Sequence, residues 1–272
     1  MHHYRRPKAW RPGTNPRVSL RGRWIARAWV LVIAAATAAQ VVTRPAAAQP
    51  AADWTEIVHG DPDTNVVALT FDAGGPVEPA QRVLDTLRSH GVHATFFLSG
   101  IWIEAHPEMG LQIVQDGHEL ANHSYTHPDF TRLSRAQIVW ELVHTDDIVF
   151  GVTGRHTFPY ARMPFGARNA RVLEAAQSAG FRSVYWTLDS TDWRNEATPE
   201  RVQTRVLRFV QPGDIVVQHS STEATAASLG AIVDDLQARG WRIGTLSEVL
   251  GVATSPPPLP ADRWWLAGPS GP

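Results

Sequence analysis

The feature that most constrains this fold is a regular alternation of short apolar segments with amphipathic segments between residues 66 and 250. Each amphipathic segment has helical periodicity and ends near a glycine, and an apolar segment follows it. Strands that alternate with helices are joined by crossover connections, which make them parallel neighbours in one sheet. The sequence therefore predicts an α/β fold with a parallel sheet, either open or closed into a barrel.

The individual elements follow from hydrophobic periodicity, capping residues and glycine stops. Strands or extended segments are predicted at residues 66–71, 93–100, 118–123, 155–166, 181–189, 214–220 and 241–246. Helices are predicted at residues 78–91, 107–117, 134–154, 170–180, 198–213 and 226–240. Ser134 is the predicted N-cap of the third helix, and Pro199 lies in the first turn of the fifth.

The first 49 residues differ in composition from the rest, because they hold nine of the 25 Lys and Arg residues and no acid. Arginines at positions 17, 21, 23 and 27 precede an apolar run, and small residues follow at 45–49. This order is typical of a secretory signal peptide, here residues 1–48, with cleavage after Ala48. The apolar run is shorter than the ~20 residues of a bilayer span. An uncleaved membrane anchor is the alternative, and secretion to the extracellular space or cell envelope is the prediction.

The remainder of the chain is acidic. It holds 16 of the 25 basic residues against all 26 acidic ones, for a net charge of −10. Such a body repels nucleic acid and anionic membranes, so we expect neither as a partner, apart from membrane contact through an uncleaved signal segment. We divide it into a short linker at 49–65, a domain at 66–252 and a proline-rich, unpacked tail at 253–272.

Polar side chains follow several of the predicted strands, at the edge where parallel α/β proteins place their reactive groups. The candidates are Asp72, His123, His127, Arg162, Asp189, Asp192 and His219. Each has a plainer interpretation by itself, such as a turn residue for Asp72, a salt bridge for Arg162 or a core histidine for His219. Their recurrence at successive strand ends favours a functional site.

His123 and His127 are four residues apart, in the segment "HSYTH". On a turn or helix, this spacing brings two imidazoles to one face, as a divalent metal ion requires. A histidine pair alone is a weak signal, and two surface histidines are the alternative. Imidazole ligands suit zinc, cobalt or nickel.

Five ordered segments resemble the motifs of the polysaccharide deacetylases, carbohydrate esterase family four, whose domain is called the NodB homology domain. They are "TFDAGG", "HSYTH", "RMPFG", "DSTDW" and "VQHS", which begin at residues 70, 123, 162, 189 and 217. The resemblance covers residues 66–250. It implies a distorted, incomplete (β/α) barrel with the site at the strand C-termini, and metal-assisted hydrolysis of an N-acetyl group, or sometimes an O-acetyl group, on a sugar.

The resemblance also implies a role for each residue of these motifs. Asp72 is the expected general base, oriented by Arg162, and His219 is the expected acid, kept cationic by Asp192. The remaining implied roles are an oxyanion contact from the Phe165 N–H, acetyl-pocket walls from Trp193 and Val217, and metal ligands from His123 and His127.

One position departs from the family pattern. The first motif usually has two adjacent aspartates, a base and then a metal ligand, and here Ala73 stands in the second place. Three interpretations follow: weak metal binding by two histidines with water or Asp189, hydrolysis with little metal dependence, or loss of catalysis with glycan binding kept. Because the acid and base are intact, we expect a secreted deacetylase acting on an acetylated amino-sugar polymer such as peptidoglycan or a chitin-like glycan. A catalytically impaired glycan-binding member and an O-acetyl esterase are the alternatives.

Overall fold

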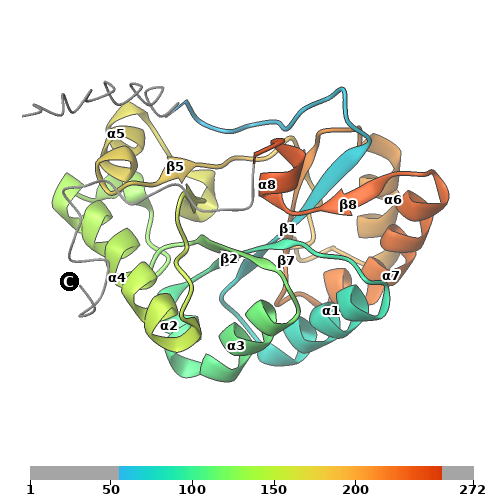
Figure 1. Cartoon of the computed structure of the whole chain (residues 1–272), viewed down its shortest axis with the longest axis horizontal. Coiled ribbons are helices and arrows are strands. Elements are labelled where there is room, and N and C mark those ends of the chain that lie inside the picture. Colours follow the sequence, from blue (N-terminus) through green and yellow to red (C-terminus); the bar gives the residue numbers. More distant parts are fainter. Residues whose placement is uncertain (1–54, 253–272) are drawn as a thin grey trace, which may run out of the picture. The chain divides into compact units, whose positions relative to one another are not determined.

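The structure is a computed structural model that describes residues 55–252 (Figure 1). Its strands are β1 Val66–Ala73, β2 Thr95–Leu98, β3 Glu119–Asn122, β4 Tyr160–Ala161, β5 Arg182–Ser183, β6 Leu188–Asp189, β7 Ile215–His219 and β8 Arg242–Gly244. Its α-helices are α1 Val77–Ser89, α2 Gly100–Ala105, α3 Pro107–Gln115, α4 Arg135–Thr153, α5 Ala170–Ser178, α6 Pro199–Phe209, α7 Glu223–Ala238 and α8 Leu246–Val249. The predicted signal peptide and proline-rich tail lie outside the described residues.

The strands form one parallel sheet in the order β5-β4-β3-β2-β1-β7-β6, with β8 beside the first residues of β1. Within the part of the chain that the structure describes, the edge strands β5 and β6 do not pair, so the curled sheet stays open. The predicted α/β fold with an incomplete (β/α) barrel is therefore confirmed. None of the helices between residues 55 and 252 is both long and apolar enough to cross a bilayer.

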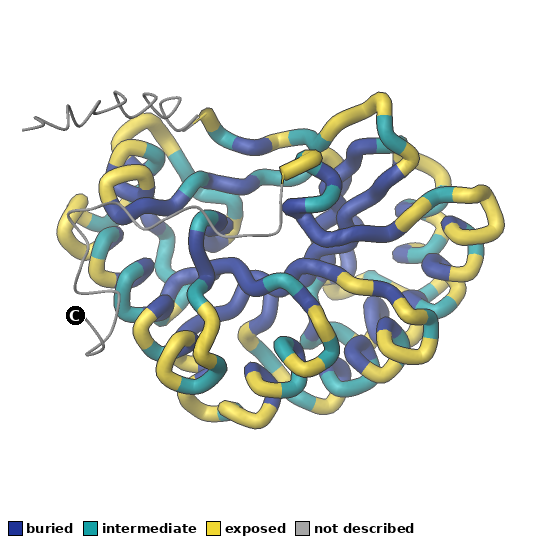
Figure 2. The backbone as a smooth tube through the Cα atoms, viewed as in Figure 1, coloured by how far each residue is buried: buried dark blue, intermediate teal, exposed yellow. Residues whose placement is uncertain are grey.

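The central strand β1 is buried along its length (Figure 2), and its apolar side chains alternate between two clusters. Val67, Leu69 and Phe71 pack in the large cluster that includes residues of α1 and α7. Val66 and Ala68 belong to a second cluster on the inner face of the sheet. A strand covered on both faces by apolar layers is what parallel sheets require.

Helix α8 closes the inner layer at the N-terminal ends of the strands. Leu246 lies in the inner cluster, and its N–H donates to the Thr95 hydroxyl at 2.7 Å. The next N–H, of Ser247, donates to Glu119 at 3.2 Å. Since Thr95 and Glu119 are the first residues of β2 and β3, this end of the barrel is filled. The opposite, C-terminal ends of the strands are left to carry the polar groups.

Several predicted elements differ from the structure in their bounds, two of them for identifiable reasons. The strand predicted at 241–246 stops at Gly244, because Thr245 and Glu248 form a capping box that starts α8. The strand predicted at 181–189 is broken into β5 and β6, with a bridge to Ile57 between them. In contrast, the predicted cap Ser134 is confirmed, since its side chain accepts from the Gln137 N–H.

Part of the segment predicted as a linker packs onto the domain. The Ile57 N–H donates to the Ser183 carbonyl at 2.8 Å, and the Tyr185 N–H donates back to Ile57 at 2.7 Å. The Ile57 side chain is buried in the inner apolar cluster. The folded domain therefore includes residues before 66. The short helix α2 was also not predicted, because its six residues are too few to show a clear period.

Candidate active site

Asp72 and Arg162 form a buried ion pair at the C-terminal ends of the strands. Arg162 Nη1 donates to Asp72 Oδ1 at 2.7 Å, and the guanidinium lies 3.9 Å from the centre of the Phe97 ring. Burial alone would raise the pKa of Asp72. The positive charge of Arg162, followed by contributions from His123 and His219, outweighs burial and holds that pKa below its usual range. Asp72 is therefore ionised at neutral pH, as a general base must be.

The orientation of His123 is set by a backbone carbonyl. Its Nδ1 lies 2.9 Å from the carbonyl oxygen of Arg162, which can only accept, so Nδ1 carries a proton. Burial lowers the pKa of His123 to about 4, and the ring is neutral at neutral pH. The lone pair therefore resides on Nε2, which lies 3.6 Å from Asp72 Oδ2. Two electron-rich atoms that face each other in a buried site favour a cation, or a water that donates to both, between them.

His127 lies beside His123, as the four-residue spacing predicted. The centres of the two imidazole rings are 4.9 Å apart. The His127 N–H donates to the Ser124 hydroxyl at 3.0 Å, and its ring packs edge-on against Phe165 with centres 4.6 Å apart. Burial lowers the pKa of His127, which keeps this imidazole available as a neutral ligand.

Among the residues that the structure describes, the two imidazoles have no third partner that would complete a protein metal site. Within residues 55–252, no three His, Cys, Asp or Glu side chains are grouped to hold a metal ion. Ala73 is fully buried in the large apolar cluster. Asp189, considered as a substitute ligand, instead accepts from the Thr191 N–H at 2.7 Å and lies 3.4 Å from the Trp193 indole nitrogen. The chemistry of His123 and His127 suits a divalent cation, but with fewer than the three protein ligands usual for catalytic zinc.

His219 and Asp192 form a second polar pair on the neighbouring strand. His219 ends β7, next to β1, and its register partner is Asp72. His219 Nδ1 lies 2.8 Å from Asp192 Oδ1. Burial disfavours the charged imidazolium, but the hydrogen bond and negative charge of Asp192 outweigh it and raise the pKa of His219 above its usual value. The site thus places the ionised carboxylate of Asp72 next to His219, whose pKa is raised.

The three residues assigned to the acetyl pocket lie around these pairs at different depths. Val217 is buried on β7, two residues before His219 and so on the same face of the strand. Phe165 and Trp193 are both exposed, in the loops that follow β4 and β6. Phe165 reaches the site through its ring contact with His127. The assignment of these three residues to a pocket stays a prediction.

Backbone strain is concentrated in the loops of the site. The non-glycine residues with positive φ in the described part of the chain are Ser124, His127, Phe165 and Thr191, with φ between 59° and 68°. All four lie in the loops after β3, β4 and β6. Such conformations cost of order 1–3 kcal/mol each and persist where the surrounding contacts enforce them.

Two buried polar residues hold the loop after β3, and sequence reasoning missed one of them, Glu141. Glu141 of α4 accepts from the N–H groups of Tyr125 and Thr126, both at 2.8 Å. Asn122 accepts from the Ser124 N–H at 2.9 Å and donates to the Leu142 carbonyl. An acid three residues after Ile138, on the face that also carries Leu142, was the available signal for Glu141. Both residues position His123 and His127 without contacting them.

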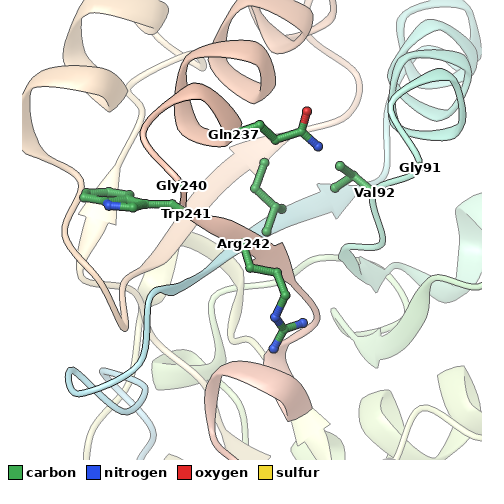
Figure 3. Close-up of a pocket in the computed structure, with 7 residues that line it drawn as sticks. Gly91, Val92, Gln237, Gly240, Trp241 and Arg242 are labelled. Carbon is green, nitrogen blue, oxygen red and sulfur yellow. The ribbon is translucent and has the colours of Figure 1, made fainter.

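The structure also contains a cavity of about 360 Å³ between α1, α7 and β8 (Figure 3). It is lined by Gly91, Val92, Gln237, Gly240, Trp241, Arg242 and Ile243. Arg242 pairs with Val66, the first residue of β1, whereas Asp72 lies near the other end of that strand. This cavity is therefore separate from the candidate active site and holds none of its acid–base groups.

This parallel incomplete barrel carries a carboxylate–arginine pair and a histidine–aspartate pair at its strand C-termini, an arrangement suited to acid–base chemistry. Residues 59–184 match the family model for polysaccharide deacetylase. The chain is 32% identical over 200 residues to the chitooligosaccharide deacetylase of Bradyrhizobium, a match that covers 68% of this chain and 91% of that protein. The chain belongs to the polysaccharide deacetylase family, as its motifs predicted.

Two further comparisons bear on activity. The peptidoglycan-N-acetylmuramic acid deacetylase PdaA of Bacillus subtilis is 28% identical over 193 residues, covering 70% of this chain and 73% of that protein. The crystal structure of BA3943 from Bacillus anthracis, described as a CE4 family pseudoenzyme, is similar with 31% identity and a TM-score of 0.69, covering 72% of this chain and 69% of that one. A mutant of that pseudoenzyme has restored enzymatic activity. The family therefore includes both deacetylases and proteins that have lost activity.

Proposed function

We propose that this chain is an exported deacetylase that hydrolyses the N-acetyl group of an amino-sugar polymer, such as peptidoglycan or a chitin-like glycan. The observation that carries the proposal is that Asp72 and His219 are register partners on adjacent strands, each with its own buried partner. The related proteins of Bradyrhizobium and Bacillus subtilis are named as deacetylases of chitooligosaccharide and of peptidoglycan. Binding of glycan without catalysis would not require both an ionised base and a cationic acid.

The proposed reaction uses the two pairs in sequence. Asp72 accepts a proton from water as the water oxygen attacks the acetyl carbon, and Arg162 keeps the carboxylate oriented. The Phe165 N–H supports the negative charge that develops on the acetyl oxygen, while Trp193 and Val217 flank the methyl group. His219 then donates its proton to the sugar nitrogen as the carbon–nitrogen bond breaks. The products are acetate and the free amine, and Asp192 stabilises the imidazolium before that transfer.

Enzymes of this family are generally metal-dependent. We propose that His123 and His127 hold the metal ion, with zinc preferred by imidazole ligands, and that the ion polarises the acetyl carbonyl when bound. The lone pair on His123 Nε2, which faces the Asp72 carboxylate, supports a cation at this place. With Ala73 in the second position of the first motif, we expect looser binding than a third protein ligand would give.

The experiment that tests the function measures metal content and acetate release on the same protein. The protein from residue 49 onward is purified, its metal is measured by elemental analysis, and acetate is assayed before and after chelation on N-acetylated and O-acetylated glycans. Activity lost with the metal supports the two-histidine site. Activity that persists shows that Asp72 and His219 work without it. Release from O-acetylated glycans alone would make the chain an O-acetyl esterase.

A second candidate function is glycan binding without catalysis. It is favoured by Ala73 and by the similarity to the pseudoenzyme from Bacillus anthracis. Absence of acetate release from every acetylated glycan, together with measurable glycan binding, would replace our proposal with this one.

Export is a separate part of the proposal and is supported by the basic, apolar and small-residue order of residues 1–48. Expression of the full chain, followed by fractionation and N-terminal sequencing of the mature protein, tests it. A mature N-terminus at Gln49 in the culture medium or envelope supports secretion. An intact N-terminus in the membrane fraction would identify an uncleaved anchor.

A further inference from the structure

Three aromatic side chains form a cluster at the surface next to the loop that carries the histidines. The ring centres of Tyr125 and Trp140 are 5.5 Å apart with perpendicular planes, and those of Tyr125 and His144 are 4.6 Å apart. The Trp140 and His144 rings, one helical turn apart on α4, are stacked with centres 4.7 Å apart. Trp140 remains 51% exposed, so a large part of its indole is open to solvent.

This cluster does not serve the apolar core. None of Tyr125, Trp140 and His144 belongs to the three apolar clusters of the described residues. The cluster is nevertheless held in place, because the Tyr125 N–H donates to Glu141 and the Tyr125 hydroxyl donates to Glu104, both at 2.8 Å. A fixed aromatic surface loses little conformational entropy when a ligand binds to it.

The cluster adjoins the candidate active site through the chain itself. Tyr125 lies two residues from His123 and two from His127, a separation of at most about 7 Å between α-carbons. Trp140 contacts Tyr125 and so enlarges this surface. A polymer whose acetylated unit is bound at Asp72 would therefore have neighbouring units within reach of this surface.

We propose that Tyr125, Trp140 and His144 form a sugar-binding platform for units of the polymer next to the one being deacetylated. A pyranose ring has an apolar face of C–H groups that packs on an aromatic ring, and hydroxyls that require polar partners. The exposed indole of Trp140 can pack against the apolar face of the sugar. The Glu104 carboxylate and the Tyr125 hydroxyl can hydrogen-bond to its hydroxyls. The ligand is the amino-sugar polymer of the proposed function, on which this inference rests.

The test compares a disaccharide with a long N-acetylglucosamine oligomer on the wild type and the variants Trp140→Ala and Trp140→Phe. For Trp140→Ala we expect the KM for the long oligomer to rise roughly 2- to 10-fold, the range that one aromatic contact supports. We expect kcat, and both constants for the disaccharide, to stay unchanged, and Trp140→Phe to recover most of the loss. Phe150→Ala is the matched control, because Phe150 is an exposed aromatic on the same helix that stacks on His156 instead.

Calorimetric binding of the long oligomer to the same variants separates this inference from the proposed function. If the wild type releases no acetate but binds the oligomer, and Trp140→Ala weakens binding, the platform stands and the deacetylase proposal falls. Equal affinity of wild type and Trp140→Ala for the long oligomer overturns the platform, whether or not acetate is released. Thermal unfolding of each variant confirms that the comparison is between folded proteins.

Discussion

His219 and Asp192 are joined by two hydrogen bonds that use both oxygens of one buried carboxylate. His219 Nδ1 lies 2.8 Å from Asp192 Oδ1, and the His219 N–H donates to Asp192 Oδ2 at 2.7 Å. The Thr225 hydroxyl also donates to this carboxylate. Burial raises the pKa of Asp192, but these hydrogen bonds and the charge of His219 outweigh it and lower that pKa. The carboxylate is therefore fixed in position and ionised, and it holds His219 in the protonated form that an acid needs.

The first prediction concerns the pH dependence of acetate release. An acid is active only while protonated, so the rate falls as pH rises through the pKa of His219, which Asp192 raises. Asp192→Asn removes the negative charge, and we expect the falling limb of the pH–rate profile to move to lower pH. The control is Asp189→Asn at the end of β6, whose carboxylate accepts from the Thr191 N–H instead. A falling limb that is unchanged in Asp192→Asn would show that His219 is not the acid.

The second prediction concerns stability. Because the folded pKa of His219 is raised, its contribution is complete below the unfolded value of about 6.5 and is lost as pH rises through the folded pKa. Because the folded pKa of Asp192 is lowered, its contribution is present above about 3.9 and is lost as pH falls through the folded pKa. We expect the free energy of unfolding of Asp192→Asn to depend less on pH in both ranges, the one above about 6.5 and the one below about 3.9. Denaturant unfolding across pH measures this, and parallel curves for the two proteins would refute it.

The third prediction tests the acid directly. His219→Ala should lower kcat for acetate release by roughly 10²- to 10⁴-fold, the usual contribution of a positioned acid. His93→Ala is the control, because His93 is an exposed histidine just before β2, at the other end of the barrel. An unchanged rate in His219→Ala would remove this residue from the mechanism.

The fourth prediction concerns the second position of the first motif. Ala73→Asp restores the carboxylate that the family pattern has after the base, and we expect tighter zinc binding measured by calorimetry. The same change should lower the free energy of unfolding in the absence of metal, because a charge then replaces a fully buried methyl group. Ala73→Asn, of nearly equal size but uncharged, is the control. Equal zinc affinity of Ala73→Asp and wild type would mean that position 73 does not reach the metal.

The fifth prediction concerns the buried ion pair. Arg162→Met leaves the Asp72 carboxylate buried without its cation, and we expect a loss of about 3–5 kcal/mol in the free energy of unfolding. The double variant Arg162→Met with Asp72→Asn should recover part of this loss, because the uncompensated charge is removed. Denaturant unfolding measures both. A double variant less stable than Arg162→Met alone would show that the pair stabilises by packing rather than by charge.

Local signals in the sequence predicted the order and type of most helices and strands. The N-cap Ser134 and the buried strand β1 are set by neighbours in the chain, and both were predicted. The break between β5 and β6 was not predicted, because it depends on Ile57, which is more than 100 residues away. Helix α8 had a local signal in Thr245 and Glu248, but the apolar run before it favoured a continued strand.

The sequence by itself determined the fold class and the candidate residues, because periodicity and short motifs act over a few neighbouring positions. Only the tertiary structure decided how those residues meet. The hydrogen bond from Arg162 to Asp72 spans 90 residues, and the one that orients His123 spans 39. The same packing buried Ala73 and engaged Asp189 with its own loop. Strand register and burial, which arise only when the whole sheet assembles, therefore set the charges, the tautomer and the ligand count of the site.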